Sequence, residues 1–347
     1  MGAAVLEIVV TPAATEESKS EEQPQMTMPS KPIIGEILEA ERMLAGYFSP
    51  TPLVRAPGIS EPGVAAYLKL ETHLPTGSFK PRGALFALDH ALRTRRVTEV
   101  TASSTGNHGA AVAWAARTLG VPATIFLPAN PNPVKRKKIA ELGARIVEVG
   151  GMDITHASAE ASAYSSKTGA YFLNDATDPD LPAGPATIGL EILSELPSVR
   201  AVYVPMGDTA LIRGVAAAVK ATHPQVRIMG VQAERAPSYY LSWKEGKPVE
   251  VEIGDTCADG LATKTAVPEN VRAIRELVDD VALVTEEQLL SAIRVLYQRE
   301  KVLAEPAGAA ATAAFLKQPC SEGPVVLLVS GANISDAVRS RAGLGAA

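Results

Sequence analysis

The chain has 347 residues, with 33 Lys and Arg against 38 Asp and Glu, so its formal net charge is −5. A hydrophobic share of 46% supports a large buried core and excludes disorder of the whole chain. Because there is no basic excess, a nucleic acid is not expected as the main partner. The length suits two domains of roughly 150 residues each, with one large α/β domain as the alternative.

The cysteine content and the hydropathy of the chain indicate the cellular compartment in which the protein is expected. Cys257 and Cys320 are too far apart for a metal cluster and give no reason to expect an oxidising compartment. No apolar run approaches the roughly 18 residues that span a bilayer. Residues 3–10 are apolar but lack the basic start of a secretory signal. The sequence therefore predicts a cytoplasmic protein with no membrane partner.

The chain opens with a segment that we expect to be disordered. Residues 11–32 are rich in Thr, Ser, Glu and Pro and have few large apolar side chains. Ordering such a segment costs more conformational entropy than its burial returns, so residues 1–32 are predicted to form a disordered tail. Beyond Pro32, short apolar runs alternate with helical stretches, which indicates a parallel α/β architecture.

Several of the expected strands are apolar throughout, as strands are when helices cover both faces of a sheet. The expected strands span Val100–Ser103, Ala123–Leu127, Arg145–Val149, Ala201–Val204, Ile228–Gln232 and Val325–Val329. Three helices between them each precede a glycine suited to a C-terminal cap, and they span Gly109–Leu119, Val134–Leu142 and Ile154–Thr168. Thr285, with Gln288 three residues later, predicts a capping box for a helix that runs to Glu300.

Four basic residues, Lys135 to Lys138, lie near the start of the second of these helices. We interpret this run as the solvent-facing side of an amphipathic helix, with nucleic-acid contact as the less favoured alternative. The negative net charge of the chain supports the first interpretation.

Three loops that lead into helices have an unusual composition. In parallel α/β sheets such loops lie at the carboxyl ends of strands, beside helix N-termini whose free N–H groups favour anions. The first is TGSFKPRG at 76–83, where Pro81 can help to start a helix. The helix dipole and Arg82 would both lower the pKa of the Lys80 amine, which predicts a nucleophile. An ordinary surface lysine is the alternative.

The second loop, SSTGNHG at 103–109, brings hydroxyl, amide and backbone N–H groups to the start of an Ala-rich helix. This composition suits a carboxylate, and simple N-capping by Asn107 is an equally open alternative. His108 has no partner at the spacing of a catalytic triad, so we interpret it as a structural residue. The third loop, PMGDTALIRG at 205–214, suits a phosphate but is neither a Walker loop nor GxGxxG.

Together and in this order, the loops resemble the tryptophan synthase β-like family of pyridoxal-phosphate enzymes, called fold type II. Within it, the chain is similar to the serine/threonine dehydratase and serine racemase group. The resemblance runs from about Ile33 to about Arg341 and rests on the motifs TGSFKPRGA, SSTGNHGAA, MGDTALIRG, CADGLA, AEPAGA and SGANI. The implied fold is α/β, with two domains that each hold an open, mostly parallel twisted sheet flanked by helices.

The resemblance also implies the domain boundaries. Residues 33–98 and 177–347 would form a large cofactor-binding domain, and residues 99–176 a small mobile domain. Pyridoxal 5'-phosphate would lie in the cleft between the two domains. The chain would form a homodimer that acts on a small amino-acid substrate.

The same resemblance assigns roles to residues of the motifs. Lys80 would be the catalytic lysine that forms a Schiff base with the cofactor, and Phe79 would pack against the cofactor ring. Asn107 would bond the phenolic oxygen of the ring, and Ser330 would face the pyridine nitrogen and leave it essentially unprotonated. The phosphate would bind Gly207, Asp208, Thr209 and Ala210. The substrate carboxylate would bind Ser104, Thr105, Gly106, Asn107 and His108, and Glu305 is a further polar candidate.

The implied reaction is a β-elimination on a β-hydroxy amino acid, threonine or serine by default, of the ammonia-lyase type. Lys80 would remove the Cα proton, and the cofactor phosphate would protonate the departing hydroxyl. The products would be a 2-oxo acid and ammonia. An unprotonated pyridine ring is a weak electron sink, which favours expulsion of a β-substituent.

Other functions stay open on the sequence. A dehydratase of 3-hydroxyaspartate or phenylserine is one alternative, because no motif fixes the pocket for the β-substituent. An amino-acid racemase or a β-replacement enzyme is a second, and a cofactor-binding relative without activity is a third. The presence of Lys80, Asn107 and Ser330 counts against the third.

The chain departs from the family at several positions. Asp208 stands where dehydratases have glycine, and a carboxylate beside a phosphate must turn away or cap the following helix. Thr105 stands in the place of the serine that is the second base of the racemase. Tyr240 replaces the second carboxylate that would complete a metal site with Glu234, so no metal is predicted. Arg213, unusual for the group, is interpreted as a solvent-facing helix residue.

Overall fold

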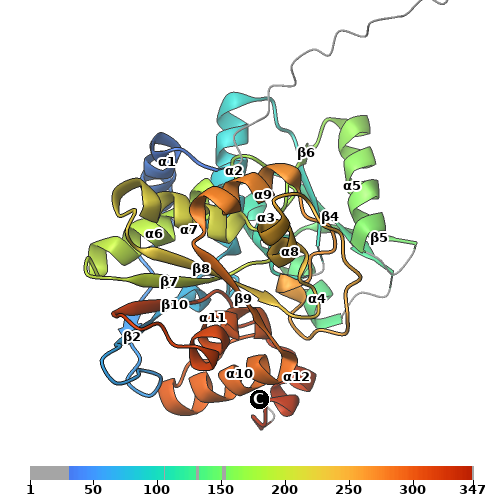
Figure 1. The fold of residues 1–347 in the computed structure, drawn as a ribbon. Coiled ribbons are helices and arrows are strands. Elements are labelled where there is room, and N and C mark those ends of the chain that lie inside the picture. The colour runs from blue at the N-terminus through green and yellow to red at the C-terminus, as the bar shows by residue number, and fades with distance from the viewer. Residues whose placement is uncertain (1–30, 105, 130–132, 151–153, 346–347) are drawn as a thin grey trace, which may run out of the picture.

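The computed structural model of the protein describes residues 31–104, 106–129, 133–150 and 154–345. Two sheets of mostly parallel strands, each flanked by helices, make up the fold, so the predicted α/β class is confirmed (Figure 1). Most of the predicted tail, residues 1–30, lies outside the described residues.

The large sheet has the strand order β1-β2-β10-β7-β8-β9. Neighbouring strands are parallel except for β1 and β2, which are antiparallel. The strands are β1 (Leu53–Arg55), β2 (Ala66–Leu70), β7 (Ala201–Pro205), β8 (Arg227–Ala233), β9 (Asp280–Val284) and β10 (Val325–Val329).

The small sheet has four parallel strands in the order β5-β4-β3-β6. They are β3 (Val100–Ser103), β4 (Ala123–Pro128), β5 (Arg145–Val149) and β6 (Tyr171–Phe172). All of them fall inside residues 99–176, the segment predicted as the small domain. The domain boundaries and the mobility of that domain stay predictions.

Helices cover both sheets, and none among the described residues is long and apolar enough to cross a membrane. They are α1 (Ile34–Leu44), α2 (Lys80–Thr94), α3 (Asn107–Leu119), α4 (Pro133–Glu141), α5 (Ile154–Thr168), α6 (Ala183–Glu195), α7 (Ala210–Thr222), α8 (Ser238–Glu245), α9 (Pro268–Leu277), α10 (Glu286–Glu300), α11 (Pro306–Lys317) and α12 (Asp336–Arg341). In Figure 1 the large sheet lies between α6 and α7 above and α10 and α11 below, with β4 and β5 at the right.

The central strand β10 shows why helices lie on both faces of the large sheet. Val325, Leu327 and Val329 pack in the cluster that holds α10 and α11. Val326 and Leu328 pack in the cluster that holds α6 and α7. Because successive side chains of a strand point to opposite faces, a strand that is apolar throughout needs cover on both.

The elements predicted from hydropathy are confirmed. Strands β3, β5 and β10 have the predicted bounds, β4 and β7 are longer by one residue at the C-terminal end, and β8 is longer by one residue at each end. Helix α5 also has its predicted bounds, whereas α3 begins at Asn107 rather than Gly109. The capping box of α10 is present, because Gln288 N donates to Thr285 Oγ1 at 3.2 Å and Thr285 N donates to Gln288 Oε1 at 2.9 Å.

Four strands lie outside the prediction, and each is very short or includes a charged residue. Strand β2 includes Lys69, which is fully buried in an ion network, and β9 begins with Asp280. Strand β6 has only two residues, and β1 is a short edge strand. Strands of two or three residues, such as β6 and β1, leave only a weak hydropathy pattern.

Helix α6 approaches the start of α2 at Gly184. A Cβ atom at this position would lie 2.2 Å from the backbone oxygen of Arg82 and 2.6 Å from the nitrogen of Gly83. No side chain fits between the two backbones, so only glycine permits this contact. The close approach fixes α6 against the first turn of α2.

We predict that Gly184→Ala lowers the free energy of unfolding by about 1–3 kcal/mol, because the added methyl group must push two helix backbones apart. Urea unfolding followed by circular dichroism measures the change. Gly35→Ala is the matched control, since a Cβ in α1 at Gly35 meets nothing within 4 Å. A Gly184→Ala protein as stable as the control would contradict the tight contact.

Candidate active site

A cavity of about 400 Å³ lies where strands of both sheets end and helices begin. Strands β3 and β7 end beside it at Ser103 and Pro205, and Ser330, which also lines it, directly follows β10. Helices α2, α3 and α7 begin beside it, with Lys80, Asn107 and Ala210 as their first residues. Helix N-termini carry partial positive charge, so several of them around one cavity favour anionic ligands.

Lys80 reaches the cavity because the preceding segment runs along the end of β10. Phe79 N donates to Ser330 O at 3.0 Å, and Ser78 pairs with Gly331. Lys80 Nζ lies 5.1 Å from the centroid of the Phe79 ring, and the Lys80 side chain is only 17% exposed. The alternative of an ordinary surface lysine is therefore wrong.

Asp175, which no sequence motif marks, contacts Lys80 in the cavity. Its Oδ2 accepts a hydrogen bond from Lys80 Nζ, and its Oδ1 lies 3.6 Å from His108 Nδ1. Burial raises the pKa of Asp175, but Lys80 and His108 outweigh burial and hold the pKa below its usual range. His108 is buried, and its Nε2 lies 2.9 Å from Leu173 O.

Asn107 is held in place by two side chains. Its Nδ2 donates to Glu305 Oε1 at 2.6 Å, and its Oδ1 accepts from Asn333 Nδ2 at 2.6 Å. The interpretation of Asn107 as an N-cap is wrong, because the cap of α3 is Gly106 and no side-chain cap bond is present. An amide nitrogen carries two hydrogens, so Asn107 retains one for a ligand in the cavity.

The segment predicted to bind a carboxylate lies along the same wall of the cavity. Ser104, Gly106, Asn107 and His108 all line the cavity. Ser104 Oγ accepts a hydrogen bond from Gly106 N at 3.1 Å, which shapes the turn into α3. Thr105, the remaining residue of that prediction, lies outside the described residues.

The loop before α7 forms a narrow backbone cradle. A Cβ at Gly207 would lie 2.2 Å from Gly260 O, so this approach requires glycine. Thr209 has a φ of 71° in the left-handed region. Within the described part of the chain, no backbone N–H from Gly207 to Ala210 donates to another protein group. Such N–H groups at a helix start suit the oxygens of a phosphate.

Asp208 turns its carboxyl group away from α7. Its Oδ1 accepts a hydrogen bond from Thr263 Oγ1 at 3.0 Å, and α7 has no side-chain cap at Thr209. Burial raises the pKa of Asp208, and the nearby Asp175 carboxylate raises it further. A raised pKa favours the neutral carboxyl group, which reduces repulsion of a phosphate in this loop.

Arg213 is buried, so its interpretation as a solvent-facing residue is wrong. Its side chain is 2% exposed, and its Nε donates to Thr209 Oγ1 at 3.1 Å. Burial lowers the pKa of Arg213 to about 10, while Tyr239, Asp175 and Asp208 oppose the decrease. The first ten residues of α7, Ala210 to Val219, are all buried. This part of the helix therefore has no solvent-facing side on which Arg213 could lie.

Lys138 also departs from its interpretation as part of a solvated face. Its Nζ donates to Thr76 O at 2.9 Å and to Asn333 Oδ1 at 2.7 Å. Burial lowers the pKa of Lys138, and the Glu305 carboxylate opposes this effect. Lys137 is exposed, as the sequence predicts. Lys138 instead ties α4 to the segment before α2.

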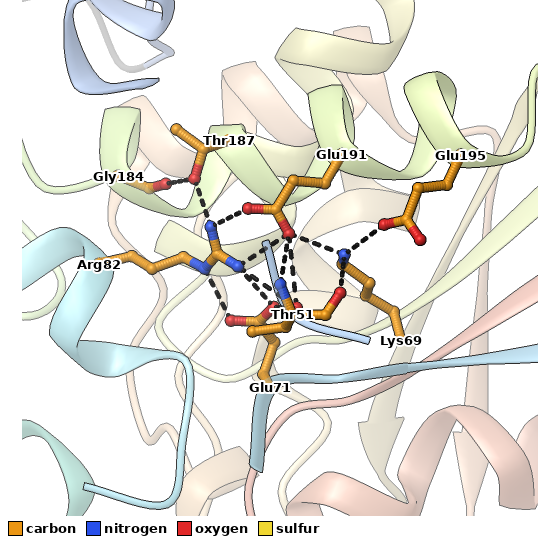
Figure 2. Close-up of polar contacts among 8 residues, drawn as sticks. All are labelled: Thr51, Lys69, Glu71, Arg82, Gly184, Thr187, Glu191 and Glu195. Carbon is orange, nitrogen blue, oxygen red and sulfur yellow. Dashed lines mark hydrogen bonds and ion pairs between the residues drawn. The ribbon is translucent and has the colours of Figure 1, made fainter. Parts of the chain in front are cut away.

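Arg82, two residues after Lys80, fixes the start of α2. Its guanidinium forms two hydrogen bonds with Glu71, at 2.8 and 3.0 Å, and two with Glu191, at 2.6 and 3.0 Å. Figure 2 shows the guanidinium between the two carboxylates, beside Thr187. Glu71 follows β2 and Glu191 lies in α6, so Arg82 joins α2 to the large sheet and to α6.

Lys69 supplies the second cation of this network (Figure 2). Its side chain is 0% exposed, and its Nζ lies 2.7 Å from Glu191 Oε2 and 2.6 Å from Thr51 O. Burial raises the pKa of Glu191, but Arg82 and Lys69 outweigh it and hold the pKa below its usual range. Two buried cations therefore compensate the carboxylates of Glu71 and Glu191.

We predict that Arg82→Ala lowers the free energy of unfolding by about 3–5 kcal/mol, because it leaves the Glu71 and Glu191 carboxylates buried without their main partner. Arg93→Ala, from the same helix, removes exposed ion pairs with Asp89 at 2.8 Å and Glu39 at 2.7 Å and should cost less than about 1 kcal/mol. Urea unfolding of both proteins gives the comparison. Equal losses in the two variants would contradict the role of the buried network.

Over residues 44–331 the sequence matches the family described as "Pyridoxal-phosphate dependent enzyme". The chain belongs to this family. L-threonine ammonia-lyase of Geobacter sulfurreducens is 40% identical over 301 residues, which cover 86% of this chain and 75% of that protein. A threonine deaminase from T.th. has a TM-score of 0.81 at 34% identity, covering 88% of this chain and 99% of that chain. Maize serine racemase has a TM-score of 0.84 at 29% identity, covering 90% and 96%.

The cavity of this pyridoxal-phosphate dependent enzyme fits its cofactor. The cradle at Gly207 to Ala210 offers unpaired N–H groups for the phosphate, and the amine of Lys80 lies in the same cavity. Phe79 and the buried Ser330 lie along the cavity wall. These residues are the ones we expect to hold the cofactor, and their individual roles stay predictions.

Three polar residues of the site escape prediction from the sequence. Asp175 follows β6, a strand of only two residues, and belongs to none of the six motifs. Asn333 lies in the SGANI motif, but the role of an amide that holds Asn107 depends on tertiary contact. Thr263, the partner of Asp208, comes just after the CADGLA motif. Among the described residues no cluster of His, Cys, Asp or Glu could hold a metal ion.

Proposed function

We propose that this enzyme catalyses β-elimination from a β-hydroxy amino acid, L-threonine or L-serine, and releases a 2-oxo acid and ammonia. The position of Lys80 carries the proposal: its amine lies in a cavity ringed by helix N-termini that suit a phosphate and a carboxylate. The ammonia-lyase and deaminase named among the relatives support the same reaction.

The residues around the cavity have distinct tasks in this reaction. The N-terminal turn of α3, with Ser104, Gly106 and Asn107, binds the substrate carboxylate and orients the amino acid. Pyridoxal 5'-phosphate, when bound, withdraws electrons from Cα of the substrate and weakens its bond to hydrogen. Lys80 then acts as the base that accepts the Cα proton. Ser330 is the group we expect at the pyridine nitrogen.

The charges of the cavity favour a substrate with a neutral β-substituent. Asp175, Asp208 and Glu305 all line it, and Lys80 is the lysine that lines it among the described residues. A second substrate carboxylate, as in 3-hydroxyaspartate, would be repelled by the ionised Asp175 carboxylate, whose pKa lies below its usual range. The hydroxyethyl group of threonine or the hydroxymethyl group of serine carries no charge and avoids this cost.

Serine racemisation is the second candidate, and the likeness to maize serine racemase supports it. A racemase needs a second base on the opposite face of the substrate from Lys80. The position from which that base acts in the related racemase is Thr105 in this chain, a residue outside the described part. Its hydroxyl is more crowded than that of serine, so elimination is the preferred proposal.

We further propose a homodimer in the cytoplasm. Both cysteines are free thiols, which suits a reducing compartment. The dimer rests on the resemblance to the family.

We predict that the cofactor-loaded enzyme releases ammonia and a 2-oxo acid in equal amounts from L-threonine or L-serine. Rates on 3-hydroxyaspartate should be lower, because a second carboxylate meets the acidic side chains of the cavity. Both products are assayed in one incubation, with D-serine and phenylserine in the panel. A preference for 3-hydroxyaspartate, or racemisation without ammonia, would contradict the proposal.

A further inference from the structure

Asp175 lies between two side chains that can carry protons. One carboxylate oxygen accepts a hydrogen bond from Lys80 Nζ, and the other lies 3.6 Å from His108 Nδ1. The three residues come from separate elements: Lys80 begins α2, His108 lies in the first turn of α3, and Asp175 follows β6. Titratable groups that converge in a cavity from separate elements are typical of an acid–base site.

The hydrogen bonds of His108 limit where its protons can lie. A carbonyl oxygen only accepts, so the contact with Leu173 O places a hydrogen on Nε2 of His108. A neutral ring then turns the lone pair of Nδ1 toward the Asp175 carboxylate. His108 Nδ1 and Asp175 Oδ1 are both buried, and neither has a hydrogen-bond partner among the described residues. A proton on either atom would satisfy both, so the gap between them suits a mobile proton.

The position of Lys80 brings Asp175 near the atoms that react. A base that removes the Cα proton must place its nitrogen against Cα, and the departing β-oxygen is only two bonds from Cα. Because Asp175 touches that nitrogen, its carboxylate comes within reach of the β-oxygen as well. The other charged groups that face Asp175 are Asp208 and Arg213, which carry opposite charges when both are ionised.

We propose that Asp175 is a second acid–base residue, which receives the proton that Lys80 removes from Cα and delivers it to the departing β-hydroxyl. The inference rests on the proposed β-elimination. It assigns to a side chain of this protein the acid role that the family resemblance gives to the cofactor phosphate.

The proton transfers balance within the substrate and the two side chains. The Cα–H electron pair becomes the second bond between Cα and Cβ, and its proton goes to the Lys80 amine. The Cβ–O bond breaks, and the oxygen leaves with its electron pair. Lys80 passes one proton to Asp175, and Asp175 passes one proton to the leaving oxygen. One water departs, Lys80 is again neutral, and Asp175 is again a carboxylate.

Two substrates with different leaving groups test this role in the holoenzyme. L-Serine must lose hydroxide, which needs an acid, whereas β-chloro-L-alanine loses chloride, which does not. We expect Asp175→Asn to lower the rate on L-serine by about 10²–10⁴-fold and the rate on β-chloro-L-alanine by less than about tenfold. Asp180→Asn is the matched control, because the Asp180 carboxylate pairs with Arg95 at 3.1 Å, and it should retain both rates.

Losses of equal size on both substrates would overturn the proposal. Asp175 would then affect only proton removal by Lys80 and not the departure of the hydroxyl. Unchanged rates would overturn it as well. A wild-type enzyme that releases ammonia from neither substrate would remove the proposed function itself, before any variant is compared. Asp175→Glu retains a carboxylate, and it should recover part of the L-serine rate lost in Asp175→Asn, while circular dichroism checks that each variant folds.

A measurement on the protein freed of cofactor tests the contact with Lys80 directly. Asp175→Asn removes the carboxylate that pairs with Lys80 Nζ, so the amine is no longer held by that contact and is more accessible to a reagent. We expect acetic anhydride to label Lys80 about tenfold faster in the variant near neutral pH, as peptide mass spectrometry would measure. Equal labelling rates in wild type and variant would overturn the ion pair on which the proton transfer depends.

Discussion

The buried contact of Arg82 with Glu71 and Glu191 is the constraint that fixes the site. One guanidinium ties the start of α2 to the end of β2 and to α6, two residues beyond Lys80. Burying these charges costs much of the energy that their attraction returns, so the network adds little net stability. Its effect is on geometry, because any shift of α2 would leave two buried carboxylates without their main partner. The absence of a side chain at Gly184 completes the same junction by letting α6 lie against the first turn of α2.

The cavity beside that junction combines groups that attract anions with acidic side chains. The helix N-termini of α2, α3 and α7 face one space and favour anions, yet Asp175, Asp208 and Glu305 line the same space. The carboxylates are tolerated because each has a specific partner: Lys80 for Asp175, Thr263 for Asp208 and Asn107 for Glu305. The site therefore combines attraction for a phosphate and a carboxylate with acidic groups that can move protons.

Much of this arrangement follows from the sequence, and the misses share one physical cause. The apolar strands β3, β7 and β10 and the loops behind them are predictable, because burial on both faces leaves a continuous hydropathy signal. Lys69, Lys138 and Arg213 are not, since a cation in a sequence predicts solvent, whereas here each has buried or half-buried polar partners. Asp175 escapes prediction because its role depends on contacts with Lys80 and His108, which come from other elements. Partner choice among buried polar groups depends on tertiary contact, which spacing along the chain does not encode.

The central claim is that Lys80, held at the start of α2, is the amine that carries the cofactor. Borohydride reduction of the cofactor-loaded enzyme makes that link permanent, and peptide mass spectrometry then identifies the modified residue. The account predicts a pyridoxyl group on Lys80 at about one per chain. A pyridoxyl group on another lysine that is withdrawn from solvent, Lys69 or Lys138, with Lys80 unmodified, would contradict it.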